Sequence, residues 1–227
     1  MPQSEWPGIW RRGRELYTRN LRPGERVYGE ELVVEDGVEY RHWDPWRSKL
    51  AAYLLNGASQ LPFDHPRRVL YLGAAHGTTL SHLSDLLPDA QLFGIEKSAG
   101  SFGAFLALSR RRSNLFPILA DAQLPERYQA DVGPVDFLYQ DIAQRNQADV
   151  FAENAAATLS ASGSALLMLK VRSVTQRRPV AAVVTESRAT LTRQGLRVVD
   201  QRSLAPFSRD HVALTVTRTG APPTVQR

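Results

Sequence analysis

Three lysines are the first residues of this chain that point to chemistry. The sequence of 227 residues contains 28 basic residues, and 25 of these are arginine, so Lys49, Lys97 and Lys170 are the exceptions. Arginine stays protonated in proteins, whereas the amine of a partly buried lysine can release and accept a proton. Each lysine is therefore a candidate for a role that arginine cannot fill, although the count alone is equally consistent with chance.

A glycine-containing turn is the second signal. The segment YLGAAHGTT (71–79) joins an apolar run to a helical run, and its small residues allow a ligand to approach the backbone at the carboxyl edge of a sheet. Glu96 ends the next strand, roughly 20 residues later, where a carboxylate accepts hydrogen bonds from ribose hydroxyls. Asp121 and Asp141 end the two strands after that. The turn alone is also consistent with a tight connection, and Glu96 with a solvated carboxylate.

The glycine spacing narrows the kind of nucleotide. After Gly73 the next glycine is Gly77, which departs from the Gly-x-Gly-x-x-Gly pattern of dinucleotide enzymes, and the P-loop pattern is missing. S-adenosylmethionine fits better, because it carries an adenosine and a charged amino-acid tail but no phosphate. The chain has no cysteine, which excludes a thiol nucleophile and a Cys-ligated metal, and we expect no metal site.

The elements that must position these residues alternate along the chain. Short apolar runs predict strands, and segments of helical composition lie between most of them. This alternation predicts a doubly wound sheet in which the last two strands pair antiparallel. The predicted strands are 67–73, 91–96, 115–119, 135–140, 165–171, 196–202 and 211–217; the predicted helices are 78–87, 98–112, 148–159 (stopped by Gly163) and 180–194 (stopped by Gly195).

A small module precedes this sheet. Residues 27–42 predict a β-hairpin that turns at Glu35-Asp36-Gly37, because an Asp-Gly pair accepts positive φ angles. Asp44-Pro45 then predicts a helix start, which places Lys49 one turn into the helix. We expect a module over 1–57, a catalytic domain over 58–219 and a loose tail over 220–227.

Composition bounds the partners and the compartment. The net charge of +5 and a pI near 9.8 favour a polyanionic partner, although a generally basic proteome explains them equally well. The three arginines at 110–112 are expected to be a solvated helix end rather than an RNA clamp. Apolar runs such as 165–169 are far shorter than the roughly 20 residues of a membrane span, and the first ten residues lack a signal-peptide pattern. We therefore expect an intracellular, cytoplasmic protein.

Seven segments in one order carry a more specific signal. Together they resemble fibrillarin and the archaeal fibrillarin-like proteins, RNA 2′-O-methyltransferases of box C/D guide ribonucleoproteins. The segments are NLRPGERVYGEEL (20–32), YRHWDPWRSKLAA (40–52), VLYLGAAHGTTLSHLSD (69–85), NLFPILADA (114–122), VDFLYQDIAQRNQA (135–148), LMLKVRS (167–173) and LAPFSRDHVAL (204–214).

The resemblance implies a fold and a site. The fold is Rossmann-like α/β, that of class I S-adenosylmethionine-dependent methyltransferases, with a seven-stranded, mostly parallel sheet, an antiparallel last strand and a small N-terminal β-hairpin module. The family's catalytic set maps onto Lys49, Asp141, Lys170 and His211. The residues expected to bind S-adenosylmethionine are Gly73, Ala74, Ala75, His76, Thr78, Thr79, Glu96, Lys97, Asp121, Ala122, Asp141 and Gln144.

The roles expected within the catalytic set follow from its chemistry. Lys170 removes or relays the proton of the 2′-hydroxyl, and Asp141 orients Lys170 and the methyl donor. Lys49 and His211 position the ribose and stabilise developing negative charge. Without the resemblance, the residues alone favour a structural histidine at a strand end for His211 and a solvated helix residue for Lys49.

The resemblance also implies partners, and the sequence departs from the family in three places. A Nop5-type scaffold, an L7Ae-type RNA-binding protein and a box C/D guide RNA would hold the chain over its target rRNA or tRNA; a homodimer stays open. His76 stands where the family commonly has serine, the helix after Glu96 matches poorly, and the glycine-arginine-rich region of eukaryotic members is absent. The alternatives are a small-molecule O-methyltransferase and a non-catalytic subunit of an RNA–protein particle.

Overall fold

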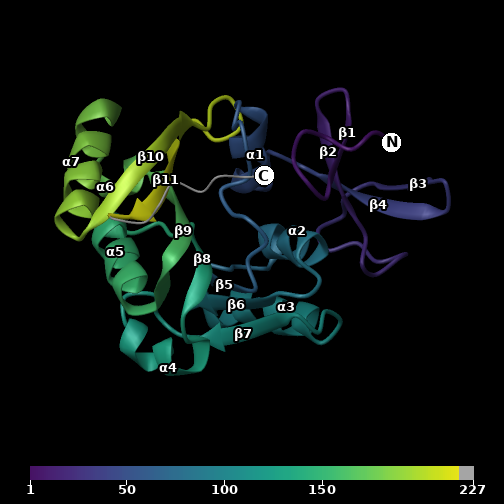
Figure 1. Cartoon of the computed structure of the whole chain (residues 1–227), viewed down its shortest axis with the longest axis horizontal. Coiled ribbons are helices and arrows are strands. Elements are labelled where there is room, and N and C mark those ends of the chain that lie inside the picture. The colour runs from purple at the N-terminus through teal and green to yellow at the C-terminus, as the bar shows by residue number, and fades with distance from the viewer. Residues whose placement is uncertain (220–227) are drawn as a thin grey trace.

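A seven-stranded mixed sheet forms the centre of the computed structural model, which describes residues 1–219 (Figure 1). Its order is β10-β11-β9-β8-β5-β6-β7, and β11 is antiparallel to both of its neighbours while β5 to β9 pair in parallel. The strands predicted from the sequence and the antiparallel pairing at the end are confirmed. Their bounds are β5 Arg68–Leu72, β6 Gln91–Glu96, β7 Leu115–Leu119, β8 Val135–Gln140, β9 Leu159–Lys170, β10 Leu196–Ser203 and β11 His211–Arg218.

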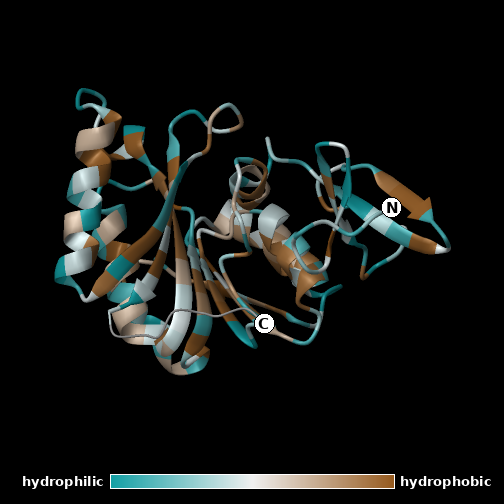
Figure 2. Ribbon diagram, turned by 45° about the horizontal axis from the view of Figure 1, so that its top comes forward, coloured by the Kyte–Doolittle hydropathy of each residue, from teal (hydrophilic) through white to brown (hydrophobic). Residues whose placement is uncertain are grey.

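Helices cover both faces of this sheet because its central strands are apolar on both sides. Along β5, Val69 and Tyr71 pack into one cluster, whereas Leu70 and Leu72 pack into the other. Figure 2 shows the corresponding hydrophobic segments along the central strands. The helices are α1 Lys49–Leu55, α2 Thr78–Leu86 and α3 Ala99–Ser109 on the first face, and α5 Gln147–Thr158 and α7 Val180–Arg193 on the second, with the short η1 Pro125–Arg127, α4 Gln129–Val132 and α6 Val171–Val174.

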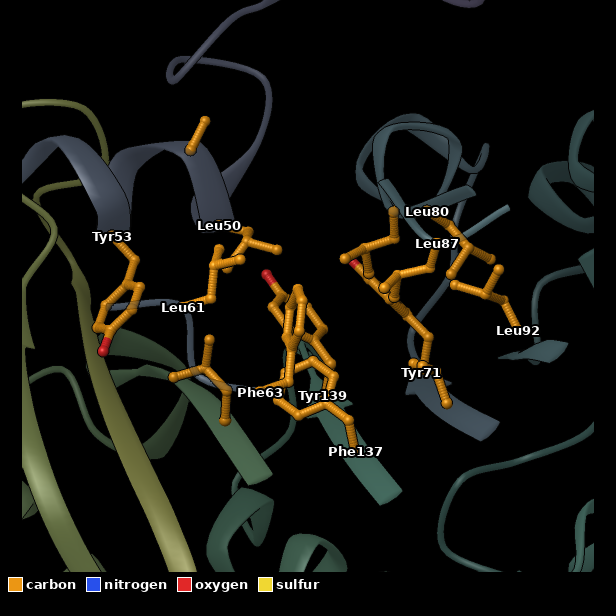
Figure 3. Close-up of a cluster of buried hydrophobic side chains, with 14 of the residues drawn as sticks. Leu50, Tyr53, Leu61, Phe63, Tyr71, Leu80, Leu87, Leu92, Phe137 and Tyr139 are labelled. Atoms are coloured by element: carbon orange, nitrogen blue, oxygen red, sulfur yellow. The ribbon is translucent and has the colours of Figure 1, made fainter. Parts of the chain in front are cut away.

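The first cluster joins α1 to the large sheet (Figure 3). Tyr71 and Tyr139 stack with their ring centroids 4.4 Å apart, and Phe63 packs on Phe137 at 4.8 Å. Leu50 is fully buried in the same cluster. Apolar burial of this kind is the main favourable term in folding, and here it fixes the helix that begins at Lys49.

A second, four-stranded antiparallel sheet lies at the N-terminus, in the order β1-β2-β4-β3. The predicted hairpin is its β3–β4 pair, and Asp36 and Gly37 adopt φ angles of 51° and 76° at the turn. Sequence analysis missed the other two strands, which are short and rich in arginine. The bounds are β1 Ile9–Arg12, β2 Glu15–Arg19, β3 Leu32–Glu35 and β4 Val38–Trp43.

Two predicted boundaries were wrong. Asp44 begins a separate turn rather than α1, because its carboxylate accepts the N–H of Trp46 at 2.8 Å and its carbonyl accepts the N–H of Ser48 at 2.9 Å. Ser48 then caps α1, so Lys49 is the first helical residue rather than one turn inside the helix. Gly163 does not stop α5; it lies within β9, where a Cβ atom would collide with the side chain of Leu159 and lie 3.1 Å from the carbonyl oxygen of Asp136.

Three further expectations concern the division of the chain, its C-terminal tail and membrane spans. The expected division into 1–57 and 58–219 stays a prediction, and the expected loose tail, 220–227, lies outside the described residues. Among residues 1–219, each helix is too short or too polar to span a membrane.

A buried network of charges joins the N-terminal sheet to α2 and to the end of α3. The side chain of Arg41 is completely buried and binds Glu30 at 2.6 Å and Asp85 at 2.7 Å. Arg112 binds the other oxygen of Asp85 at 2.6 Å and is 3% exposed. The expectation that arginines 110–112 form a solvated helix end is therefore wrong for Arg112. Each buried charge in this network has an opposite charge beside it, as burial of ions requires.

Replacing Arg41 tests this network. Arg41→Met leaves two buried carboxylates short of a cation, so we expect the free energy of unfolding to fall by about 3–5 kcal/mol. Urea denaturation measures this change. Arg11→Met is the matched control, because Arg11 pairs with Glu5 at the surface, where such a pair contributes about 0–1 kcal/mol. Equal losses for the two variants would contradict the importance of the buried network.

Candidate functional site

The four residues of the expected catalytic set meet at the carboxyl edge of the large sheet. Asp141 directly follows β8, and Lys170 is the last residue of β9. Because β11 runs antiparallel to β9, its first residue, His211, lies opposite Lys170 in the register. Lys49 reaches the same edge from the first position of α1. Four segments far apart in sequence thus supply one cluster.

An ion pair lies at the centre of this cluster. The Nζ atom of Lys49 is 2.6 Å from Oδ2 of Asp141, and the two side chains are 28% and 19% exposed. The expected role of Asp141, to orient Lys170, stays a prediction; the structure shows its carboxylate paired with Lys49. The reason is the start of α1: because the helix begins at Lys49, this side chain projects toward the end of β8.

His211 is held neutral beside that pair. Its Nδ1 atom is 2.8 Å from the hydroxyl of Ser208, and its Nε2 atom is 4.0 Å from Oδ1 of Asp141. Burial, together with the nearby cations Lys49 and Lys170, lowers the pKa of His211 to about 3. The Nε2 atom is buried and has no hydrogen-bond partner among residues 1–219. A neutral imidazole with one free ring nitrogen can form a hydrogen bond with a substrate hydroxyl.

The backbone of Lys170 is fixed by a buried glutamine. Gln147 accepts the N–H of Lys170 at 2.8 Å and donates its amide to the carbonyl of Lys170 at 3.0 Å. Gln140 in turn donates to the carbonyl of Gln147 at 2.8 Å. Gln147 was not among the predicted site residues, because a polar glutamine at the start of a helix is usually exposed. This clamp determines where β9 ends and where the Lys170 side chain starts.

A cavity of about 250 Å³ adjoins the catalytic cluster at the same sheet edge. Eight of the twelve residues expected to bind the cofactor line it, and Ile95 and Ile142 supply apolar walls that sequence analysis did not single out. The eight are Gly73, Ala75, Glu96, Lys97, Asp121, Ala122, Asp141 and Gln144.

The glycine turn forms one wall of the cavity. Gly73 has a φ of 84°, and a side chain on it would collide with the carbonyl oxygen of Asp141, so only glycine fits there. The carboxylate of Glu96 accepts the N–H groups of Ala75 at 2.8 Å and Ser98 at 2.7 Å. A carboxylate has about four acceptor positions, so Glu96 can hold this loop and still accept hydrogen bonds from a ligand.

The opposite wall holds a second carboxylate. Asp121 accepts the N–H of Gln123 at 3.0 Å, and Lys97 lies 3.6 Å away. These two contacts hold the pKa of Asp121 below its ordinary value, the N–H of Gln123 contributing most. The Oε1 atom of Gln144 is buried and has no hydrogen-bond partner among the described residues. The wall therefore offers acceptors to a ligand that donates hydrogen bonds.

The other four expected cofactor residues lie elsewhere. Ala74 and Thr79 are buried, and the hydroxyl of Thr79 donates to that of Ser48, the cap of α1, at 3.0 Å. His76 and Thr78 line a separate hollow of about 460 Å³, which also contains arginines 26, 47 and 111. Thr79 thus connects the glycine turn to the helix that carries the lysine of the ion pair.

A further hollow, of about 470 Å³, lies at the opposite edge of the sheet. Asp136, Gly163 and Arg197 are among its lining residues, and all of the expected site residues lie outside it. The expected site residues therefore gather at the smaller cavity, of about 250 Å³, and not at this larger hollow.

Comparisons with known proteins show which family the chain is similar to. The family model named Fibrillarin matches residues 3–219. The fibrillarin-like rRNA/tRNA 2′-O-methyltransferase of Methanosarcina acetivorans is 42% identical over 204 residues, 88% of this chain and 89% of that protein. The fibrillarin of Aeropyrum pernix, solved with natively bound S-adenosyl-L-methionine, is 42% identical with a TM-score of 0.83 and coverage of 89% of each chain. The fibrillarin of a solved fibrillarin/Nop5p complex is 37% identical with a TM-score of 0.84, and the match covers 96% of this chain and 100% of that chain.

The low pKa of His211 leads to a prediction about pH. The folded chain keeps this histidine neutral, whereas the unfolded chain protonates it near pH 6.5. The resulting stability is present above pH 6.5 and is lost as the pH falls toward 3, at about 1.4 kcal/mol per pH unit. Lys49→Met removes one cation and leaves Asp141 facing the ring, so we expect the pKa of His211 to rise.

NMR titration of the histidine ring measures this change. We expect the parent ring to stay neutral down to pH 5. In urea denaturation at pH 6.5 and pH 5, the free energy of unfolding of Lys49→Met should fall less than that of the parent. A parent ring that titrates near pH 6 would show that the buried environment described for His211 is wrong.

Proposed function

The chain belongs to the fibrillarin family, and from this premise we propose that it transfers the methyl group of S-adenosylmethionine to ribose 2′-hydroxyls of RNA. The observation that carries the proposal is the double position of Asp141. Its backbone contacts Gly73 and its side chain lines the cavity, while its carboxylate pairs with Lys49. A methyl donor in the cavity and a hydroxyl at the ion pair would therefore lie on two sides of one residue.

The residues of the cavity fit S-adenosylmethionine. We propose that Glu96 accepts hydrogen bonds from the ribose of the cofactor, and that Asp121 and Gln144 accept them from the adenine amino group. The glycine turn lets the cofactor approach the backbone at Gly73 and Ala75. When bound, S-adenosylmethionine supplies an electrophilic methyl group on a positively charged sulfur. The likeness to a fibrillarin solved with this cofactor supports the proposal.

The residues of the cluster act on the substrate hydroxyl. An alcohol is a weak nucleophile, so its proton must leave as the new bond forms, and we propose that Lys170 accepts or relays this proton. The positive charge of Lys49 stabilises the developing alkoxide, and Asp141 holds Lys49 in place at 2.6 Å. The free Nε2 atom of His211 orients the ribose. Most of the rate enhancement then comes from fixed positions of the two reactants.

Target choice is assigned to partners. We propose that a Nop5-type scaffold, an L7Ae-type protein and a box C/D guide RNA position the chain over rRNA or tRNA in the cytoplasm. The similarity to the fibrillarin of a Nop5p complex supports the scaffold. The net charge of +5 attracts RNA without reading its sequence. A homodimer is a further arrangement that gel filtration would detect.

Cofactor binding should need no partner. Because the cavity residues lie on one sheet edge, we expect the isolated chain to bind S-adenosylmethionine in a calorimeter. Glu96→Ala should weaken binding by roughly 1–3 kcal/mol, or about 5- to 150-fold in Kd. Glu186→Ala removes an exposed carboxylate on α7 and should leave Kd unchanged. Parental affinity in Glu96→Ala would remove Glu96 from the site.

Methylation tests the full proposal. We expect the particle assembled from the chain, both partner proteins and guide RNA to methylate one nucleotide of a guide-matched RNA, and the isolated chain to do so poorly, because a basic surface supplies no register. Incorporation of labelled methyl groups measures both. Efficient methylation of one site by the isolated chain would contradict this division of labour.

Two lysine-to-arginine variants in the same assay separate charge from proton transfer. Arginine keeps the charge but stays protonated. We therefore expect Lys170→Arg to lower turnover by roughly 10²-fold or more, the usual contribution of a positioned base. Lys49→Arg should lose less than about tenfold, since it needs only to pair with Asp141. Near-parental turnover of Lys170→Arg would leave Lys170 as a positioning charge.

A further inference from the structure

A partly exposed aromatic pair lies on the two segments that lead into Lys49 and His211. Trp46 is 64% exposed and is the one aromatic residue among the strongly exposed large apolar side chains of residues 1–219. Its ring meets that of Phe207 edge-on, with centroids 5.2 Å apart and planes at 76°. In this geometry the ring that contributes its edge to the contact keeps both of its broad faces free of the other ring. Neither the cofactor cavity nor the catalytic cluster, as described above, accounts for this pair.

Both aromatic residues belong to segments that carry catalytic residues. Trp46 stands three positions before Lys49, and Phe207 stands four positions before His211. The backbone N–H of Trp46 is held by the carboxylate of Asp44 at 2.8 Å. The two aromatic rings are therefore carried by the same turns that lead into Lys49 and His211.

Internal hydrogen bonds stiffen the loop of Phe207. The N–H of Ser208 donates to the carbonyl of Leu204 at 2.8 Å, and the N–H of Leu204 donates to the carbonyl of His211 at 3.0 Å. The amide of Asn56, at the end of α1, donates to the carbonyls of Ser203 and Ala205 at 2.8 and 3.0 Å. The loop is thus tied to α1, and the pair joins two segments that are already fixed to each other.

The charges around the pair suit a polyanion. Arg47 follows Trp46, and Arg209 comes two residues after Phe207; both are exposed. The acidic side chain of Asp210 is offset by Arg172 at 3.8 Å, while Asp44 is only partly exposed. Aromatic faces interleaved with arginines are the usual surface for RNA, because the rings stack on nucleotides and the cations attract phosphates.

We propose that Trp46 and Phe207 form a platform that packs against the sugar and base faces of the RNA next to the ribose that is methylated. This inference rests on the proposed function, and it adds a contact that directs the strand toward Lys49 and Asp141. The platform supplies affinity for RNA and plays no part in cofactor binding or in proton transfer.

Steady-state kinetics of the assembled particle test the platform. We expect Trp46→Ala to raise KM for guide-matched RNA about tenfold, within the range for loss of one aromatic–nucleotide contact, with kcat changed less than twofold. Phe207→Leu should act in the same direction, and Trp46→Phe should restore most of the parental KM. Val34→Ala is the matched control, since Val34 is 67% exposed on β3. Kd for S-adenosylmethionine and the melting temperature should stay parental throughout.

Fluorescence gives a readout that does not depend on activity. Trp46 is 64% exposed, Trp6 and Trp43 are 2% and 0% exposed, and Trp10 is partly buried, so stacking on RNA at the platform should quench mainly Trp46. We expect target RNA annealed to its guide to quench the parent chain and to quench Trp46→Phe much less. An inactive parent particle would overturn the proposed function, yet this titration would still decide for or against the platform.

Two outcomes would overturn the platform. Parental KM and equal quenching in the Trp46 variants would show that the pair is surface packing only. Weaker binding of Trp46→Ala to the Nop5-type scaffold, with an unchanged KM for RNA, would show that the pair contacts a protein instead.

Discussion

The site depends on a single close approach, that of Gly73 to the backbone of Asp141. The lack of a side chain at Gly73 allows the first turn of the sheet to lie against the end of β8. As a result, one carboxylate closes the cofactor cavity and anchors the lysine of α1. A larger residue at position 73 would push the turn after β5 away from the end of β8, and so would separate the cavity from the ion pair.

The N-terminal sheet extends this constraint to the rest of the chain. Its buried arginine, Arg41, is bound to Asp85 of α2, and the first turn of α2 contacts Ser48 through Thr79. The chain between them, from β4 to α1, is therefore held at both ends. The N-terminal sheet therefore helps to fix the start of α1, and with it the position of Lys49.

Local patterns predicted the central sheet well, because buried parallel strands are apolar runs separated by helices. The hairpin at Asp36-Gly37 was equally clear, since its turn demands positive φ angles. What the pattern missed depends on distant contacts. The arginine-rich strand β2 pairs with β4, and β1 pairs in turn with β2. Arg112 is buried because Asp85 faces it, and Gln147 is a clamp only because Lys170 ends a neighbouring strand. The resemblance supplied the expected catalytic set, which stays a prediction, and the structure shows that Asp141 pairs with Lys49.

The reversed strand β11 has a consequence for the synthesis of the protein. His211 meets Lys170 only after β11 has been inserted between β9 and β10, and it lies near the end of a chain of 227 residues. A ribosome releases the chain from its N-terminus onward, and a domain generally folds as a unit, so the sheet stays incomplete until β11 is available. The strand that fills the last gap in the sheet thus also brings His211 to Lys170, so the expected catalytic cluster and the sheet are completed in one event.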